Sequence, residues 1–142
     1  MLIPRTVADL MTREVVTVHE EDNLAAAEEA MGRHGFRHVP VVDGERVVGL
    51  ISNRDVLRYS VSPLEGRAVE ADADLKSVTF VADIMSREVT TVNPETPLEQ
   101  AADLMLAGKL GCLPVIDWGG RLVGIVTSTD FVRLVARLLD SR

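Results

Sequence analysis

The chain has few of the residues on which several classes of protein depend. It has one cysteine, Cys112, so no disulfide can form within it and nothing points to an oxidising compartment. Aromatic residues make up 4% of the sequence, which favours small units of sheet and helix over an aromatic-rich barrel. No apolar stretch approaches the roughly 20 residues that cross a bilayer, and the first residues lack the apolar core of a signal peptide. We therefore expect a soluble, cytoplasmic protein that does not bind membranes.

Positive charge and catalytic side chains are also scarce. Lys and Arg number 15 against 22 Asp and Glu, and the net charge is −7, whereas nucleic-acid binding rests on clustered basic residues. His34 and His38 have the spacing of a helical metal pair, but Gly35 and Pro40 argue against a helix there. Cys112 has no histidine in its half of the chain to act as a base, which favours a buried filler. We expect no nucleic-acid partner, no metal, no cofactor and no enzymatic activity.

The sequence contains an internal repeat of two copies. Without gaps, residues 7–43 and 81–117 share 16 identities in 37 positions. After this stretch the offset grows by one residue, inside a turn between two apolar runs. Each copy has the pattern β-α-β-β-α. We predict an α/β (α+β) fold with copies over 7–60 and 80–140, packed by their sheets with pseudo-twofold symmetry, and an exposed connection over 61–79.

One motif, G-x-x-[ST]-x-x-D, occurs in both copies, over Gly49–Asp55 and Gly124–Asp130. Each instance follows a β-branched apolar run and precedes a helical pattern, so the hydroxyl and the carboxylate should lie where a strand passes into a helix. A helix start is a place where phosphates bind. The same spacing also fits a capping box, in which the two side chains satisfy backbone N–H groups and have no ligand. Both interpretations stay open.

The ordered motifs resemble those of a known family. Val-Ala-Asp-Leu/Ile-Met, Thr-Val, His38–Asp43 and Gly49–Asp55, repeated through Leu113–Asp117 and Gly124–Asp130, are similar to a stand-alone tandem pair of cystathionine β-synthase (CBS) domains, a Bateman module. The resemblance covers nearly the whole chain. It implies two CBS motifs and a cleft between them that binds an adenosine-containing ligand, namely AMP, ADP, ATP or S-adenosylmethionine.

The resemblance also assigns roles to residues. Asp55 and Asp130 would hold the ribose, and Ser52 and Thr127 would meet the phosphates. A short carboxylate can accept hydrogen bonds from both ribose hydroxyls, and charge-assisted hydrogen bonds are strong. An apolar slot for adenine would come from the extended run and the Pro-containing strand of each copy, although plain core packing explains the same residues. These are Val16, Thr17, Val39 and Pro40, with Thr90, Thr91, Leu113 and Pro114.

The two copies differ in charge beside the motif. Arg37 and His38 precede the Pro-containing strand of the first copy, and Arg54 lies just after its hydroxyl residue. The second copy has Gly111 and Cys112 in place of the basic pair. Because an anionic ligand on a negatively charged protein needs local cations, we predict that the first copy is the nucleotide-phosphate site. The second is empty or takes a less negative ligand such as S-adenosylmethionine or adenosine.

These features predict a non-catalytic regulatory module that senses energy or metabolite state through an adenosine-type ligand and acts on an unidentified protein. The alternative is a structural or protein-interaction module with an unliganded cleft. The last helical pattern is apolar on one side, over Leu134, Val135, Leu138 and Leu139. That side, and the family resemblance, predict a homodimer.

Overall fold

The structure is a computed structural model that describes residues 3–59 and 68–140. It divides into two compact units, Val16–Val89 and Met1–Val15 with Thr90–Arg142. We call them the 16–89 unit and the 90–142 unit and describe each by itself. Both combine short strands with helices, so the predicted α+β class is confirmed.

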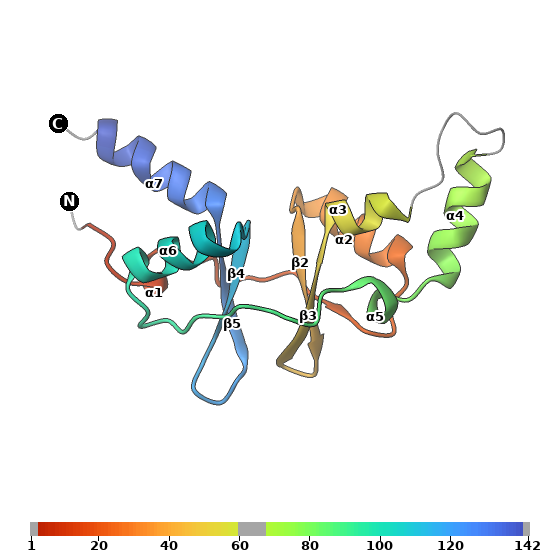
Figure 1. The fold of residues 1–142 in the computed structure, drawn as a ribbon, viewed down its shortest axis with the longest axis horizontal. Helices are drawn as coiled ribbons and strands as arrows, with labels where there is room; N and C mark the ends of the chain where they lie inside the picture. Colours follow the sequence, from red (N-terminus) through yellow and green to blue (C-terminus); the bar gives the residue numbers. More distant parts are fainter. Residues whose placement is uncertain (1–2, 60–67, 141–142) are drawn as a thin grey trace. The chain divides into compact units, whose positions relative to one another are not determined.

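The 16–89 unit is built on a three-stranded sheet (Figure 1). The strand β1 (Val18–His19) pairs parallel to β2 (His38–Asp43), and β2 pairs antiparallel to β3 (Arg46–Ser52). Parallel neighbours need a crossover, which α2 (Leu24–His34) supplies. The unit continues through α3 (Asn53–Arg58), α4 (Ala68–Val78) and α5 (Val81–Ile84). Its core contains Val18, Leu24, Ala27, Met31, Val39, Val41, Ile51, Val56, Val81 and Met85.

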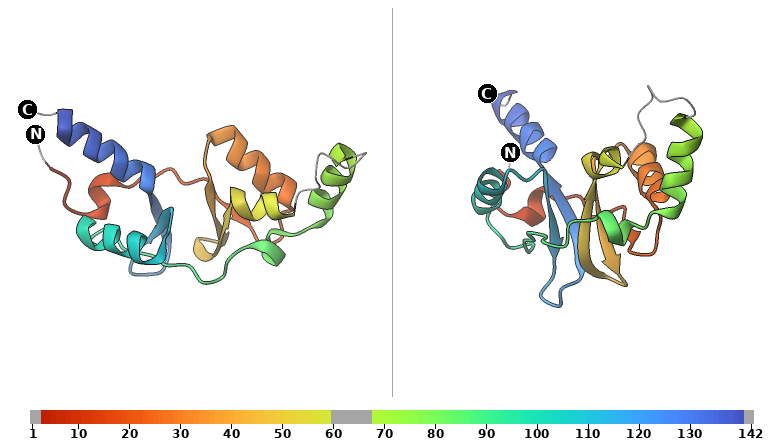
Figure 2. Two further views of the ribbon diagram at one scale, coloured as in Figure 1. Left: turned by 45° about the horizontal axis from the view of Figure 1, so that its top comes forward. Right: turned by 45° about the vertical axis from the view of Figure 1, so that its right-hand side comes forward.

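The 90–142 unit repeats this plan with a smaller sheet. Its strands β4 (Cys112–Ile116) and β5 (Leu122–Thr127) form an antiparallel hairpin, and the predicted first strand is reduced to one parallel bridge between Val92 and Val115. Two helices, α1 (Val7–Leu10) and α6 (Leu98–Gly108), lie on the same side of that hairpin (Figures 1 and 2). The helix α7 (Ser128–Asp140) follows β5 directly. The core contains Val7, Met11, Val92, Leu98, Ala101, Met105, Leu113, Val115 and Val126.

The two repeat copies exchange their first segments. Val7 and Met11 begin the first copy but are buried in the core of the 90–142 unit. Val81 and Met85 begin the second copy but are buried in the core of the 16–89 unit. The units of packing therefore differ from the sequence copies 7–60 and 80–140, whose bounds stay predictions.

Backbone hydrogen bonds fix each exchanged segment beside the last strand of its unit. The N–H groups of Leu50 and Ser86 each donate to the other residue's carbonyl, both at 2.9 Å. Thr12 and Ile125 make the same reciprocal pair at 2.9 Å in the other unit. Each pair occupies the free edge of β3 or β5, so neither strand presents an unpaired backbone there.

The connection over 61–79 contains a helix that the sequence did not predict. Residues 61–67 lie outside the described residues, and 68–78 form α4, most of whose described residues are exposed. The bounds of the connection stay a prediction. Lys76 is 6% exposed, and its Nζ contacts carboxylates of Asp72, at 2.8 Å, and of Glu28 on α2. Both views of Figure 2 place α4 beside α2. Burial disfavours the Lys76 charge, but the hydrogen bonds with Asp72 and Glu28 outweigh it and raise the Lys76 pKa.

Candidate functional site

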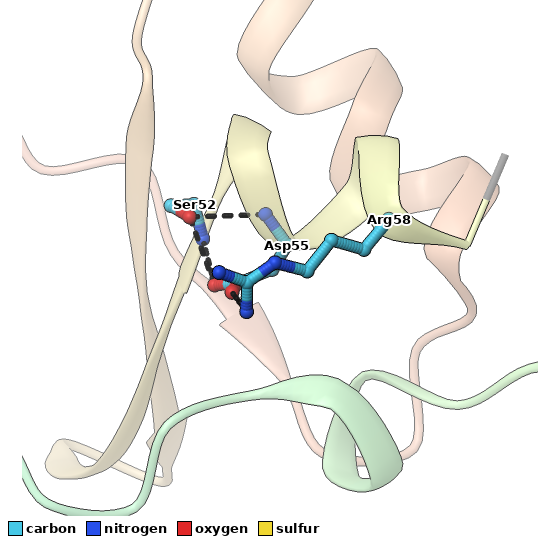
Figure 3. A network of polar contacts seen from close by, with 3 residues as sticks. All are labelled: Ser52, Asp55 and Arg58. Carbon is cyan, nitrogen blue, oxygen red and sulfur yellow. Dashed lines mark hydrogen bonds and ion pairs between the residues drawn. The ribbon is translucent and has the colours of Figure 1, made fainter.

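The turn from β3 into α3 holds Ser52 and Asp55 against each other (Figure 3). The Ser52 backbone N–H donates to Asp55 Oδ2 at 2.8 Å, and the Ser52 hydroxyl donates to the same oxygen at 2.9 Å. The Asp55 N–H donates to Ser52 Oγ at 3.1 Å. Figure 3 also shows the Arg58 guanidinium beside Asp55, with Nη1 4.0 Å from Oδ1.

The turn from β5 into α7 repeats this geometry. The Thr127 N–H donates to Asp130 Oδ2 at 2.8 Å, and its hydroxyl donates to the same oxygen at 3.1 Å. The Asp130 N–H donates to Thr127 Oγ1 at 3.3 Å. The motif therefore folds in the same way in both units, and the capping-box interpretation is confirmed at both turns.

The capping role leaves part of each carboxylate for other partners. All hydrogen bonds that the described residues give to Asp55 and Asp130 go to Oδ2. The second oxygen, Oδ1, accepts none of them, and both residues are half-buried and not enclosed. One carboxylate can thus close the turn with one oxygen and accept a ligand hydroxyl with the other.

The start of each helix has fewer N–H groups available to an anion than the sequence suggested. The first helical N–H of α3, on Asn53, donates to the Arg37 carbonyl at 2.8 Å, and that of α7, on Ser128, donates to the Gly111 carbonyl at 2.9 Å. The N–H groups of Asp55 and Asp130 are bonded as described above. Side-chain cations and hydroxyls must therefore carry most of any phosphate contact.

The structure brings the predicted cations of the first copy together. His38 begins β2 and pairs in register with Ser52 at the end of β3. It is half-buried, and burial lowers its pKa; Asp55 opposes this shift, while Arg37 and Arg54 reinforce it. Arg37 and Arg54 are exposed. Arg37 and Arg54 therefore lie close enough to act on His38, which pairs with Ser52, and their contact with a phosphate stays a prediction.

The second copy has Cys112 where the first has His38. Cys112 begins β4 and pairs in register with Thr127, which is the position that His38 holds opposite Ser52. It is 3% exposed, and burial raises the pKa of its thiol to about 12. A thiol with that pKa is protonated and unreactive at neutral pH. Cys112 is thus a buried filler, as the sequence predicted.

The eight residues predicted to form adenine slots divide into two groups. Val39 and Leu113 belong to the two cores, which supports the core-packing alternative for them. Pro40 and Pro114 are fully buried as well. The other four, Val16, Thr17, Thr91 and Thr90, are half-buried or exposed, and they precede the residues that pair parallel to Val41 and Val115. Their contact with adenine stays a prediction.

Sequence reasoning missed what lies beside the motif glycines. A Cβ on Gly124 would lie 2.7 Å from Met11 Sδ and 3.0 Å from the Thr12 carbonyl oxygen. A Cβ on Gly49 would collide with Met85 Sδ in the same manner. These glycines therefore make room for the exchanged segments. Glycine inside a strand is a sequence signal for close backbone approach, and it could have indicated this contact.

The described residues hold neither a clustered metal site nor a membrane-spanning helix. Residues 3–59 and 68–140 contain no group of three or more His, Cys, Asp or Glu placed to hold a metal ion. No helix in the same part of the chain is long and apolar enough to cross a bilayer.

Comparison with known proteins decides the family. A family model for the CBS domain matches residues 7–62 and 81–137. The chain belongs to the CBS domain family. The predicted resemblance to a tandem CBS pair is therefore confirmed. Each matched segment carries one copy of the G-x-x-[ST]-x-x-D turn.

Solved CBS domain pairs have the same fold. The structure of CBSX2, a protein from Arabidopsis thaliana, in complex with AMP is 30% identical, with a TM-score of 0.79, and the match covers 98% of this chain and 100% of that one. The CBS domain pair of MJ0100, solved with 5′-methylthioadenosine and S-adenosyl-L-methionine, is 28% identical, with a TM-score of 0.76, over 95% of this chain and 99% of that one.

Several curated relatives are much longer than this chain. An uncharacterized protein of Methanocaldococcus jannaschii, MJ1225, is 31% identical over 130 residues, which are 90% of this chain and 46% of that protein. The chain spans 22% of an inosine-5′-monophosphate dehydrogenase of Korarchaeum cryptofilum. The CBS pair thus also occurs as a part of longer proteins, enzymes among them.

Proposed function

We propose that this CBS pair is a non-catalytic regulatory module that binds an adenosine-containing ligand and senses energy or metabolite state. The observation that carries the proposal is the pair of matching turns, in which Asp55 and Asp130 accept the capping hydrogen bonds through Oδ2 and not through Oδ1. Arg58 Nη1 lies 4.0 Å from Asp55 Oδ1 and would share that oxygen with a ligand. A ribose offers two neighbouring hydroxyl donors, which suit such an oxygen. Relatives solved with AMP and with S-adenosyl-L-methionine support this ligand class.

The charges around the turns give the two units different ligands. Arg37, His38 and Arg54 gather near Ser52, so the 16–89 unit suits an adenosine phosphate, AMP, ADP or ATP. Cys112 and Gly111 leave the Thr127 turn without matching cations, so that turn suits adenosine or S-adenosylmethionine, or stays empty. Ligand binding would favour one arrangement of the protein over another and so alter its affinity for a regulated partner.

Isothermal titration calorimetry with AMP, ADP, ATP and S-adenosylmethionine tests the proposal. We expect AMP to bind the native protein, and we expect Asp55→Ala to remove most of that binding. Asp9→Ala is the matched control. Asp9 Oδ2 accepts hydrogen bonds from the N–H groups of Arg5 and Thr6, at 3.0 and 3.1 Å, and so caps the start of α1 as Asp55 caps the start of α3. Asp9 lies far in sequence from either motif. Its replacement should leave AMP affinity unchanged.

A second readout separates this function from an interaction module without a ligand. A ligand that binds only the folded state adds about 2.7 kcal/mol to the free energy of unfolding when its concentration is a hundred times its dissociation constant. The melting temperature rises as a result. The absence of both heat and a melting shift with all four compounds would contradict the sensor function.

We also propose that a second copy of the chain covers α7. None of the α7 residues is buried, and Val132, Val135 and Leu139 are 68%, 53% and 72% exposed on one short helix. A helix with an exposed apolar side suits a self-complementary twofold interface. Sedimentation equilibrium should give a dimer for the native chain and a monomer for Val135→Glu. Trp118→Glu, in the β4–β5 turn, is the control that should remain dimeric.

A further inference from the structure

His38 differs from every other cation of the candidate phosphate site because its charge changes near neutral pH. Arginine side chains as a class do not titrate in the ordinary pH range, whereas an unperturbed histidine titrates near pH 6.5. His38 is also fixed in place, since it begins β2 and pairs in register with Ser52 on β3. The Arg37 carbonyl accepts from the Asn53 N–H at 2.8 Å and ties the residue before His38 to α3.

The surroundings of His38 favour the neutral form of its imidazole in the free protein. Burial lowers its pKa, and the positive charges of Arg37 beside it and Arg54 on α3 lower it further. Asp55, also on α3, acts in the opposite direction but does not restore the ordinary value. An anion that entered this group of charges would reverse the balance, because a phosphate within a few ångströms favours the protonated imidazole.

We propose that His38 takes up one proton from solvent when an adenosine phosphate binds beside Ser52, so that the 16–89 unit binds phosphorylated ligands more tightly as the pH falls. This inference rests on the proposed function and adds pH to what the module senses. The Thr127 turn has Cys112 at the equivalent register position, so it has no group that can take up a proton in this way.

The sign follows from linkage. If the bound state holds one more proton than the free state, affinity rises as pH falls between the two His38 pKa values, by at most tenfold per pH unit. The ordinary pKa of histidine is 6.5, the free-state value lies below it, and the bound-state value lies above the free one. The expected pH window therefore begins below pH 6.5 and extends upward as far as the bound phosphate raises the His38 pKa.

A histidine titration by nuclear magnetic resonance on the native chain tests this directly. The sequence has three histidines, so His19→Gln and His34→Gln suffice to assign the imidazole signals. We expect saturating AMP to raise the His38 pKa by one unit or more and to leave those of His19 and His34 in place. Adenosine, which has the same base and sugar but no phosphate, should move none of the three.

Calorimetry between pH 5.5 and 8 supplies a second readout. The AMP phosphate itself titrates near pH 6, so the pH dependence of the native protein is compared with that of His38→Asn, which shares the ligand's titration but lacks the imidazole. We expect a steeper rise in AMP affinity toward low pH for the native protein.

The outcomes separate this inference from the function on which it rests. AMP binding with an unchanged His38 pKa would overturn the proton uptake and leave the ligand site in place. A similar pKa rise with adenosine would overturn the role of the phosphate. An absence of binding heat at every pH would overturn the proposed function itself, and the inference with it.

Discussion

The Ser52 and Thr127 turns share one backbone design but differ in the residue that faces the hydroxyl. Both close a capping box through Oδ2 of an aspartate, with hydrogen bonds between 2.8 and 3.3 Å. Across the strand pair, the first turn faces His38 and the second faces Cys112. The two copies thus share the capping-box turn but differ in the side chain at the paired strand position. A ligand preference can differ between two halves that fold alike.

The largest expected effect concerns the residue at that register position in the second half, the Cys112 thiol, which should be unreactive. A thiol pKa of about 12, against an ordinary 9.0, lowers the thiolate fraction at pH 8 by about a thousandfold. We expect Cys112 to react with a chromogenic disulfide reagent far more slowly than a free thiol, and to react fully once urea unfolds the 90–142 unit. Rapid labelling of the native protein would contradict the burial on which the comparison depends.

The exchanged methionines should matter equally in the two units. Met85 and Met11 are 7% and 9% exposed and reach the motif glycines of their units. Replacing either with alanine should lower the free energy of unfolding by about 3 kcal/mol, measured by urea denaturation. Met85→Leu and Met11→Leu, which keep the volume, are the controls and should lose much less.

Hydrogen exchange then assigns each loss to a unit. Met85→Ala should expose amides of β2 and β3, and Met11→Ala should expose amides of β4 and β5. If Met11→Ala instead loosened β2 and β3, the exchange of first segments between the repeat copies would be wrong.

The capping hydroxyls should contribute a smaller and similar amount. Ser52→Ala and Thr127→Ala each remove the acceptor of an N–H at the start of a helix, which costs about 1 kcal/mol. Ser52→Thr and Thr127→Ser keep the hydroxyl and should stay within a few tenths of the native stability by thermal denaturation. The capping-box interpretation of the motif fails if the alanine variants are as stable as the native protein.

An effect of similar size is predicted at the helix ends before β2 and β4. Gly35 ends α2 with φ of 69°, and Lys109 takes the same left-handed conformation after α6 with φ of 53°. A lysine is strained there and glycine is not, so Lys109→Gly should stabilise the protein by about 1 kcal/mol. Gly35→Ala should destabilise it by a similar amount. Opposite signs in the two melting temperatures are the expected result.

The sequence predicted the parts of the fold that depend on local pattern. The repeat and the strand-to-helix turns both follow from spacing along the chain, and the structure has them. The proximity of Arg37 to His38 was also predictable, because neighbours in sequence stay neighbours at the start of a strand.

The parts that the sequence did not predict depend on distant partners. The two copies begin with nearly the same residues, so no pattern tells whether Val7 packs with its own copy or with the other. The polar segment of α4 gave no sign that Lys76 would be buried, because its partner Glu28 lies 48 residues away in sequence. The single use of Oδ2 at Asp55 and Asp130 is visible only in three dimensions.

The central claim is that the Ser52 turn binds an adenosine phosphate and the Thr127 turn, which pairs with Cys112 in place of a histidine, binds it less well. A titration of isotopically labelled protein with AMP, followed by backbone amide shifts, measures both turns in one sample. We predict that the amides of His38, Ser52 and Asp55 saturate at a lower AMP concentration than those of Thr127 and Asp130. Equal saturation at both turns, or movement at Thr127 first, would contradict the claim.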